Sequence, residues 1–537
     1  MGHAILPSAG PAPGVFTGEL IVVQERPNPT NARPDARTSA NQIGALCFLY
    51  PDTRTSSSRP MSAETVPPAV QDSPMNEREP VKVDRHVAQQ SRFHAMLAGR
   101  KNLLAMWGPN AYRAKAFSFK FLRQHYFVCN SPDTVKRVFL EEHDNYDRKS
   151  PQMRHALEPL LGDGLFVSDG ELWRQRREQC APAFEANLLP AFAALMTASA
   201  QELADRWAAL PEDAQVDMLG EMARLTARII GRTLFGDDTA ESDAEQVVRG
   251  FSEYQATIEQ LSFADTFGLP FLRWFRNPIR HIQSRRSLTK VHRVIDRIIE
   301  RHRIHPADER LTLLSHLLDG AGGKPGEEMR CPMSAEAARN EAIVMFMAGH
   351  ETTANSLAWC WYLLDHSPAA AARLREELDR VLGGRPPGFK DVPNLPYTRA
   401  VFEETMRLYP PVPLLSRQAR QGDEIRGKKV HPDTIILVIP WLLHRHELYW
   451  EKPDHFMPER FLPGAPRPDK FIYLPFSVGR RVCLGMRFGL TEGILCLATL
   501  AQRFQPRLRA GHQVEIECRL TLRPKGGLPM SPGPRAA

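Results

Sequence analysis

The feature that most constrains the fold is a strongly apolar stretch in the second half of the chain. Residues 342–364 are about as long as a membrane-spanning helix, yet His350, Glu351 and Asn355 lie in their midst. Ionisable side chains at such a place are costly in lipid, so the stretch predicts a helix buried in a large soluble core. We expect no membrane span in this chain.

Composition places the chain among ordinary globular proteins. It has 537 residues, of which 42% are hydrophobic and 24% charged, and 69 basic against 62 acidic residues give a net charge of +7. The basic residues form no long runs interleaved with aromatic residues, so we expect no nucleic-acid partner. Eight cysteines are scattered without Cys-x-x-Cys pairs, which is typical of a reducing cytoplasm.

The composition and the hydrophobic pattern along the chain predict one large domain. Residues 1–78 are rich in Pro, Ser, Thr and Ala and are predicted to be disordered, residues 79–525 form a mainly helical domain with small β-sheets, and residues 526–537 form a flexible tail. Two short alternating segments near residues 117–128 predict small strands. Helices are predicted at 132–141, 170–180, 186–209, 217–235, 242–261, 278–303, 334–366, 367–382, 395–409 and 484–504.

A loop that ends at a helix start carries the strongest chemical signal. Phe476, Gly479, Arg481, Cys483 and Gly485 follow the spacing Phe-x-x-Gly-x-Arg-x-Cys-x-Gly. Helix N-terminal amides and a nearby cation favour a charged sulfur, and glycines let the backbone pass close to a flat ring. A lone cysteine is more often a small buried hydrophobe, but five matched positions favour a thiolate ligand.

The middle of the apolar helix carries a second signal, Ala348-Gly349-His350-Glu351-Thr352-Thr353. The Gly349 position leaves room against a ring face, and the Thr352 hydroxyl can bond back to a carbonyl. The Glu351 carboxylate can pass protons through water. Taken alone, such a run is more often a polar seam than a catalytic pair.

Two weaker patterns involve arginines. Glu404 and Arg407 are three residues apart and so share a helix face, although most such pairs are exposed and contribute well under about 1 kcal/mol. Trp173 and Arg177 likewise place an indole N–H and a guanidinium on one face, where both can reach a carboxylate. Without the other motifs, an ordinary basic helix is the simpler interpretation. His444, His446 and His455 lack a partnering pattern of ligands and are interpreted as structural.

Together these motifs, which occur in order between Trp173 and Gly485, resemble those of the cytochrome P450 (P-450) family of haem-thiolate monooxygenases. The resemblance covers residues 79–525 and implies the family's mainly α fold with small sheets. It implies haem b (iron protoporphyrin IX) held by the thiolate of Cys483 as axial metal ligand. It also implies that Glu351 and Thr352 supply protons for dioxygen activation.

The same resemblance assigns roles to the arginines. Trp173, Arg177, Arg481 and more weakly Arg417 would bind the haem propionates, because an arginine offers a fork of donors matched to a carboxylate. Glu404, Arg407 and Arg460 would form a buried ion network that braces the cysteine loop. The implied enzyme is a stand-alone oxidoreductase that takes electrons from a separate ferredoxin or flavoprotein reductase, with a docking surface near Arg480 and Arg481.

Substrate chemistry and two alternatives stay open. Five aromatic residues, Phe251, Phe263, Phe267, Phe271 and Phe346, indicate an apolar small-molecule substrate, but core packing explains them about as well. A peroxide-driven enzyme or haem isomerase on the same fold is disfavoured by the intact Glu351 and Thr352. A haem-binding sensor without turnover is distinguishable only by activity measured with a reductase present.

Overall fold

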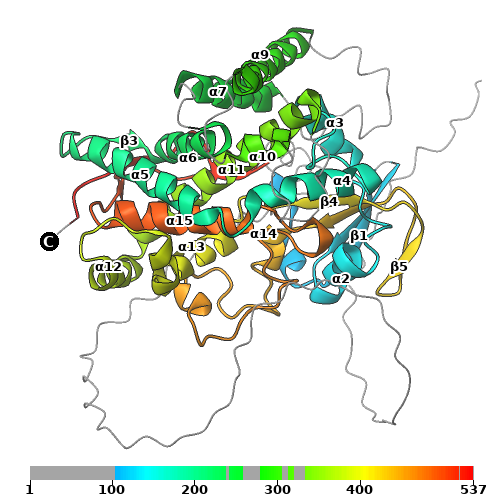
Figure 1. The fold of residues 1–537 in the computed structure, drawn as a ribbon. Coiled ribbons are helices and arrows are strands. Elements are labelled where there is room, and N and C mark those ends of the chain that lie inside the picture. The colour runs from blue at the N-terminus through cyan, green and yellow to red at the C-terminus, as the bar shows by residue number, and fades with distance from the viewer. Residues whose placement is uncertain are drawn as a thin grey trace, which may run out of the picture. The chain divides into compact units, whose positions relative to one another are not determined.

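The computed structural model describes residues 103–121, 123–236, 241–257, 278–304, 312–319, 333–518 and 520–535. The expected disordered segment, residues 1–78, lies outside the described residues, as do Phe263, Phe267 and Phe271. Figure 1 shows helices as the dominant element, with strands confined to small sheets. The predicted fold class, mainly α with small β-sheets, is therefore confirmed.

The long apolar stretch forms helix α11, Ala335–His366. Its first turn is capped by Ser334, whose hydroxyl accepts a hydrogen bond from the Ala337 N–H at 3.2 Å. Helix α11 packs against α6 most extensively and also contacts α13 and α15, as Figure 1 shows for the green and orange ribbons. Helix α5 packs on α15. The bounds of these four helices are α5 Leu189–Ala208, α6 Met218–Phe235, α13 Pro396–Leu408 and α15 Met486–Ala501.

Burial explains the polar residues inside α11. The His350 ring is stacked on Phe346 with a centroid distance of 6.2 Å, and burial lowers the pKa of His350 to about 4, so the ring is neutral at pH 7. Within the part of the chain that the structure describes, no helix is long and apolar enough to cross a membrane.

The other helices surround this core. Proline or glycine begins most of them, and the Pro residues lie in the first turn, where the missing N–H has no helical partner. They are α2 Pro132–Lys136 continued by the π-helical turn η3 Arg137–Glu141, α3 Pro151–Leu161, α4 Gly170–Cys180, α7 Glu241–Thr257, α9 Pro278–Ile304, α10 Leu313–Asp319, α12 Pro368–Leu382 and α14 Pro440–Leu443.

Every helix predicted from the sequence is present, but three were missed. Helices α10 and α14 have seven and four residues and are too short for a sustained period of 3.6 residues. Helix α3 buries Ala156, Leu157, Leu160 and Leu161 at helical spacing, but Pro159 lies inside it and argues against a helix in the sequence. One predicted helix is shorter at the C-terminus than expected, because α15 ends at Ala501, whereas the predicted end of α7 at residue 261 lies outside the described residues.

The largest sheet has four strands in the order β1-β2-β7-β4. Strands β2 and β7 run parallel, and the other two pairs are antiparallel. Its strands are β1 Ala116–Phe121, β2 Gln124–Cys129, β4 Leu415–Gln418 and β7 Ile435–Val438. The sheet brings Arg417, on β4, to the side of the domain that holds α4 and the cysteine loop.

Short ribbons of two or three strands complete the fold. They comprise β5 Asp423–Ile425 with β6 Lys428–Val430, β9 Ile516–Cys518 with β10 Leu522–Pro524, and β3 Val216–Asp217 with β11 Pro529–Ser531 and β8 Arg507–Leu508. Strand β11 corrects the expected flexible tail at residues 526–537. Met530 pairs with Val216 and Leu508 and is fully buried, so the domain continues past residue 525.

Candidate haem and oxygen site

The cysteine loop closes on itself through backbone hydrogen bonds. The Cys483 N–H donates to the Phe476 carbonyl at 2.9 Å, and the Val482 N–H donates to the Gly479 carbonyl at 3.1 Å. Gly485 is the N-cap residue of α15, so Cys483 precedes the first turn of that helix, as predicted. The loop therefore holds the sulfur near a helix N-terminus.

Cys483 differs from the other cysteines that the structure describes. It has an exposed side chain, whereas Cys129, Cys180, Cys360, Cys496 and Cys518 are buried. The protein atoms packed around its sulfur desolvate the thiol and raise its pKa, while the Gly485 N–H and the Arg177 charge act in the opposite direction. These two groups are the ones that would favour a thiolate.

Gly479 is required by a close backbone contact. Its φ of +75° is in the left-handed region, and a Cβ at this position would lie 2.1 Å from the carbonyl oxygen of Phe139. The contact joins the loop to η3. The close approach that the surrounding protein requires of this glycine is therefore to the Phe139 backbone.

Positive charges gather beside the loop, around the indole of Trp173. The Arg481 guanidinium lies 4.4 Å and the Arg177 guanidinium 5.7 Å from the centroid of this ring. Arg177 Nη2 donates to the Val482 carbonyl at 2.9 Å, and Arg481 Nη2 donates to the Ser168 carbonyl at 2.8 Å. The structure therefore brings together Trp173, Arg177 and Arg481 as the sequence predicted.

Arg417 and Lys149 extend this cluster. The Arg417 guanidinium lies 4.8 Å from the centroid of the Phe139 ring, and both cations are buried. Burial, together with the charge of Arg481, lowers the pKa of Arg417 to about 9, and burial with the charges of Arg417 and Arg481 lowers the pKa of Lys149 well below its usual value. Burial and neighbouring charges also lower the pKa of Arg481 to about 10.

The cluster of Lys149, Arg177, Arg417 and Arg481 has too little negative charge around it. Among the described residues, none of the four forms an ion pair with a carboxylate, and the nearby Asp147 is hydrogen-bonded to Arg420 at 2.8 Å. Buried like charges are costly unless an anion joins them. The arrangement therefore fits a ligand that carries carboxylates.

Glu351 and Thr352 lie on α11 at the predicted place. Thr352 Oγ1 donates to the Ala348 carbonyl at 2.7 Å, which is the predicted back-bond, and α11 remains continuous through it. Thr521, which precedes β10, donates from its hydroxyl to Glu351 Oε1 at 2.7 Å. The carboxylate is thus oriented from the C-terminal ribbon.

Gly349 lies in the contact between α11 and α6. A Cβ at this position would meet Ile230 Cδ1 of α6 at 3.0 Å. The glycine therefore allows α6 to approach α11, and Thr226 of α6 donates to the His350 carbonyl at 2.9 Å in the same interface.

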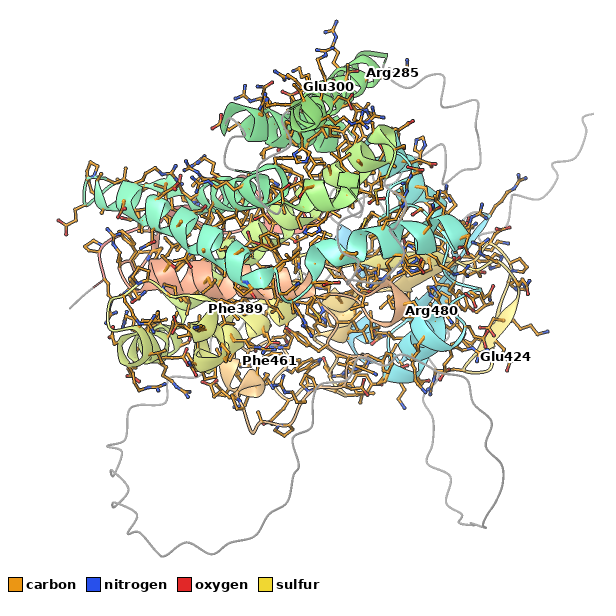
Figure 2. All side chains as sticks on the ribbon, viewed as in Figure 1. Arg285, Glu300, Phe389, Glu424, Phe461 and Arg480 are labelled. Atoms are coloured by element: carbon orange, nitrogen blue, oxygen red, sulfur yellow. The ribbon has the colours of Figure 1, made fainter. Side chains whose placement is uncertain are left out.

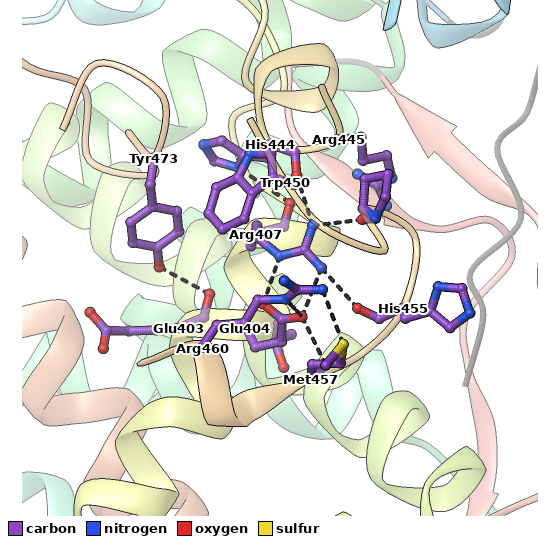
Figure 3. Close-up of polar contacts among 12 residues, drawn as sticks. Glu403, Glu404, Arg407, His444, Arg445, Trp450, His455, Met457, Arg460 and Tyr473 are labelled. Carbon is purple, nitrogen blue, oxygen red and sulfur yellow. Dashed lines mark hydrogen bonds and ion pairs between the residues drawn. The ribbon is translucent and has the colours of Figure 1, made fainter. Parts of the chain in front are cut away.

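Figure 3 shows the network around Glu404 and Arg407, both of which are fully buried. Arg407 donates two hydrogen bonds to the Glu404 carboxylate, at 2.6 and 2.7 Å. Its remaining donors reach the carbonyls of His444, Pro453 and His455 at 2.7 to 2.9 Å. Two donors of the guanidinium fork therefore pair within α13, and the other three join α13 to the segment that follows it.

Arg460 is the third member of this network. Its Nε lies 3.5 Å from Glu404 Oε1, and its Nη2 donates to the Glu451 and Lys452 carbonyls. The network reaches the cysteine loop through His444, whose Nε2 accepts a hydrogen bond from the Leu474 N–H at 3.1 Å. Glu404, Arg407 and Arg460 are thus connected to the backbone two residues before Phe476.

Comparison with known proteins agrees with this arrangement. Residues 106–529 match the model of the family described as Cytochrome P450. The chain belongs to the cytochrome P450 family. It is therefore a haem monooxygenase, and the family's haem b is held by a cysteine thiolate.

Two relatives in this cytochrome P450 family are bacterial and similar over most of their length. Cyclooctatin synthase of Streptomyces melanosporofaciens is 32% identical over 450 residues, which cover 82% of this chain and 93% of that protein. A putative cytochrome P450 132 of Mycobacterium tuberculosis is 31% identical, over 76% of this chain and 88% of that protein. A bifunctional cytochrome P450/NADPH–P450 reductase of Bacillus cereus is 29% identical, over 76% of this chain and 38% of that protein.

The residues of this cytochrome P450 fit the cofactor of the family. An accessible thiol at a helix start suits iron ligation, and four cations without paired carboxylates, two of them buried, suit the two propionates of haem b. Lys149 was not found from the sequence. It lies in Arg148-Lys149-Ser150, a run without a pattern of its own, and only the fold brings it to Arg417 and Arg481.

Two interpretations were left open for the phenylalanines, and the structure favours core packing for the two that it describes. Phe346 is stacked on Phe235 with a centroid distance of 6.2 Å, and Phe251 is also buried. Arg481 stacks on Trp173, whereas the side chain of Arg480, which is labelled in Figure 2, is exposed. A docking surface near the loop would therefore present Arg480.

Proposed function

We propose that this cytochrome P450 binds haem b through Cys483 and inserts one atom of dioxygen into an apolar small molecule. The observation that carries the proposal is the accessible Cys483 thiol beside a cluster of cations without carboxylate partners, of which Lys149 and Arg417 are buried. Bound haem supplies the redox chemistry that activates dioxygen. The haem propionates would be held by the cluster of Lys149, Arg177, Arg417 and Arg481. The Trp173 N–H would be a further hydrogen-bond donor.

Glu351 and Thr352 are proposed as the proton-handling pair. Both lie on one turn of α11, and the Thr352 hydroxyl already bonds to the Ala348 carbonyl, which leaves its oxygen free to accept a proton-bearing water. Thr521 orients the carboxylate of Glu351. The network of Glu404, Arg407 and Arg460 is proposed to brace the cysteine loop and to take no part in proton transfer.

An apolar substrate is supported by the segment between α3 and α4. Leu165, Phe166 and Val167 follow one another there, and the Phe166 ring is partly exposed, 37% of the residue being accessible. Side chains of this kind favour burial of an apolar ligand. We further propose a cytoplasmic location, for which the six described cysteines, all unbridged, are supporting evidence.

Electrons are proposed to come from a separate ferredoxin or flavoprotein reductase. Arg480, whose side chain is 53% exposed, offers a positive charge close to the cysteine loop, although Asp144 lies 3.3 Å away and offsets part of it. Charge on the rim of a docking surface acts mainly on the association rate.

Turnover under ¹⁸O₂ tests the proposal and its alternatives. The purified haem-loaded protein would be mixed with a ferredoxin, a ferredoxin reductase and NADPH, and offered limonene as an apolar probe and perillic acid as its charged counterpart. We expect one ¹⁸O atom in an alcohol formed from limonene, only with the reductase present. Equal product with peroxide alone would favour the peroxide-driven alternative, and no product from limonene or from a wider set of apolar compounds would favour a sensor.

A further inference from the structure

The segment between α3 and α4, residues 162–170, is held at both of its ends. Gly162 ends α3 with a φ of +54°, and at the other end the Gly170 N–H donates to Asp147 Oδ2 at 2.8 Å. The Ser168 carbonyl accepts from Arg481, two residues before Cys483. The segment therefore runs from the end of α3 to the cysteine loop.

Two adjacent residues of α11 hold the middle of this segment. Asn340 Nδ2 donates to Asp163 Oδ1 at 2.9 Å, and both carboxylate oxygens of Glu341 accept from the Leu165 N–H, at 2.9 and 3.1 Å. Arg176 of α4 completes the ring, because its Nη2 donates to Asp163 at 2.7 Å and its Nε lies 3.7 Å from Glu341. Glu341 is fully buried.

The backbone of residues 162–164 packs closely against side chains of α11. A Cβ on Gly162 would lie 2.3 Å from Asn340 Nδ2, and one on Gly164 would lie 2.9 Å from Val344 Cγ2. Val344 is one turn of α11 before Ala348, where the Thr352 hydroxyl is bound. The segment is thus seated on α11 immediately upstream of the proposed oxygen site.

We propose that Asn340 and Glu341 are positioning residues that fix Leu165 and Phe166 as one wall of the substrate pocket. The inference rests on the proposed function, since it assigns the pocket to the haem side of α11. The clamp, meaning Asn340 and Glu341 with Asp163 and Arg176, ties this wall to α11, and Arg481 ties it to the cysteine loop. If a substitution weakens the clamp, the wall can move, and the affinity of the pocket for a ligand then changes according to the size of the ligand.

The affinities of ligands that bind haem iron can show whether the wall has moved. Pyridine is small and needs only the iron, whereas 4-phenylpyridine extends its second ring into the pocket. Soret titrations of both would be made on the haem-loaded protein and its Glu341→Leu, Glu341→Gln and Asn340→Ala variants. Glu336→Gln is the matched control, because Glu336 is on the same helix with a side chain 77% exposed.

The clamp predicts that pyridine affinity is unchanged in every variant. It predicts that Glu341→Leu changes 4-phenylpyridine affinity by about 10-fold, as expected for the loss of one hydrogen bond to a charged group, with smaller changes for Glu341→Gln and Asn340→Ala. Exchange of the Leu165 amide hydrogen should speed up in the same order. If Glu341→Leu does not fold, the other two variants carry the test.

The ligand titrations distinguish a wrong clamp assignment from a wrong proposed function. Unchanged 4-phenylpyridine affinity and unchanged Leu165 exchange, in variants whose pyridine binding and thiolate spectrum are intact, would overturn the clamp alone. A wild-type protein that gives no pyridine shift would overturn the haem assignment on which the clamp rests.

Discussion

At the scale of single residues, the cations beside Cys483 are costly in the protein alone and useful once an anion joins them. Arg417 is 3% exposed and Lys149 is 7% exposed, and each lies in the field of Arg481. Such a site favours the binding of a dianionic ligand, and it lowers the free energy of unfolding of the protein when that ligand is absent.

Replacement of Arg417 by Met should therefore act in opposite directions on two quantities. The haem-free protein should become more resistant to urea, because a buried like charge is removed while a chain of similar length still packs on Phe139. Haem affinity should fall by about 10- to 100-fold, as expected for a lost charge-assisted hydrogen bond. Urea titration and haem transfer to apomyoglobin would measure the two effects, and a parallel loss of both would contradict this account.

Glu341 predicts a pH dependence of stability. Burial is the main cause that raises the pKa of this carboxyl from 4.5 to about 7, the charge of Asp163 raises it further, and the Leu165 N–H, Arg176 and Cys180 act against it. Because the folded state holds the proton more tightly, the contribution of Glu341 to stability is complete below pH 4.5 and is lost as pH rises through about 7.

Glu341→Gln should accordingly flatten the fall in stability between pH 5 and pH 7. The slope removed is on the order of 1 kcal/mol per pH unit. Urea midpoints of the haem-loaded protein at pH 5, 6 and 7, compared with those of Glu336→Gln, would measure it. An unaltered slope in Glu341→Gln would show that this carboxyl does not titrate in the window.

At the scale of elements, α13 is joined to the chain before the cysteine loop by buried charge. Glu404 and Arg407 satisfy each other, and Arg407 also binds three carbonyls, while the His444 ring accepts from Leu474. Removal of one partner leaves the other charge buried and unpaired.

Arg407→Ala should therefore destabilise the protein by about 3 to 5 kcal/mol. The exposed Arg373→Ala, on α12, serves as the control, with an expected change within about 1 kcal/mol because surface ion pairs contribute little. Urea unfolding would measure both, and the thiolate Soret band of any folded Arg407→Ala should be weakened. Similar stability losses in the two variants would count against a bracing network.

Elements with a long helical period were predictable from sequence, and so were the motif residues on them. Sequence could not supply contacts that depend on the fold. Lys149 reaches Arg417 only because α3 and β4 are adjacent through Ser150 and Ser416, whose hydroxyls lie 2.8 Å apart. Thr521 meets Glu351 across 170 residues, and Gly349 and Gly479 serve contacts with Ile230 and Phe139 that no local spacing encodes.

At the scale of the whole molecule, segments far apart in sequence carry the groups of the proposed site. Helix α4 supplies Trp173 and Arg177, β4 supplies Arg417, α11 supplies Glu351 and Thr352, and the loop before α15 supplies Cys483. Only the complete domain assembles these groups. The central claim is that Cys483 ligates the haem iron at their meeting point.

The difference spectrum of the reduced protein with carbon monoxide tests that claim most directly. Wild type and Cys483→Ser would be compared at equal haem content, with Cys518→Ser, a buried cysteine on β9, as the control. We predict the long-wavelength Soret band of thiolate-ligated haem in the wild type and in Cys518→Ser, and its loss in Cys483→Ser. A wild-type protein without this band, or a band that persists in Cys483→Ser, would contradict the account.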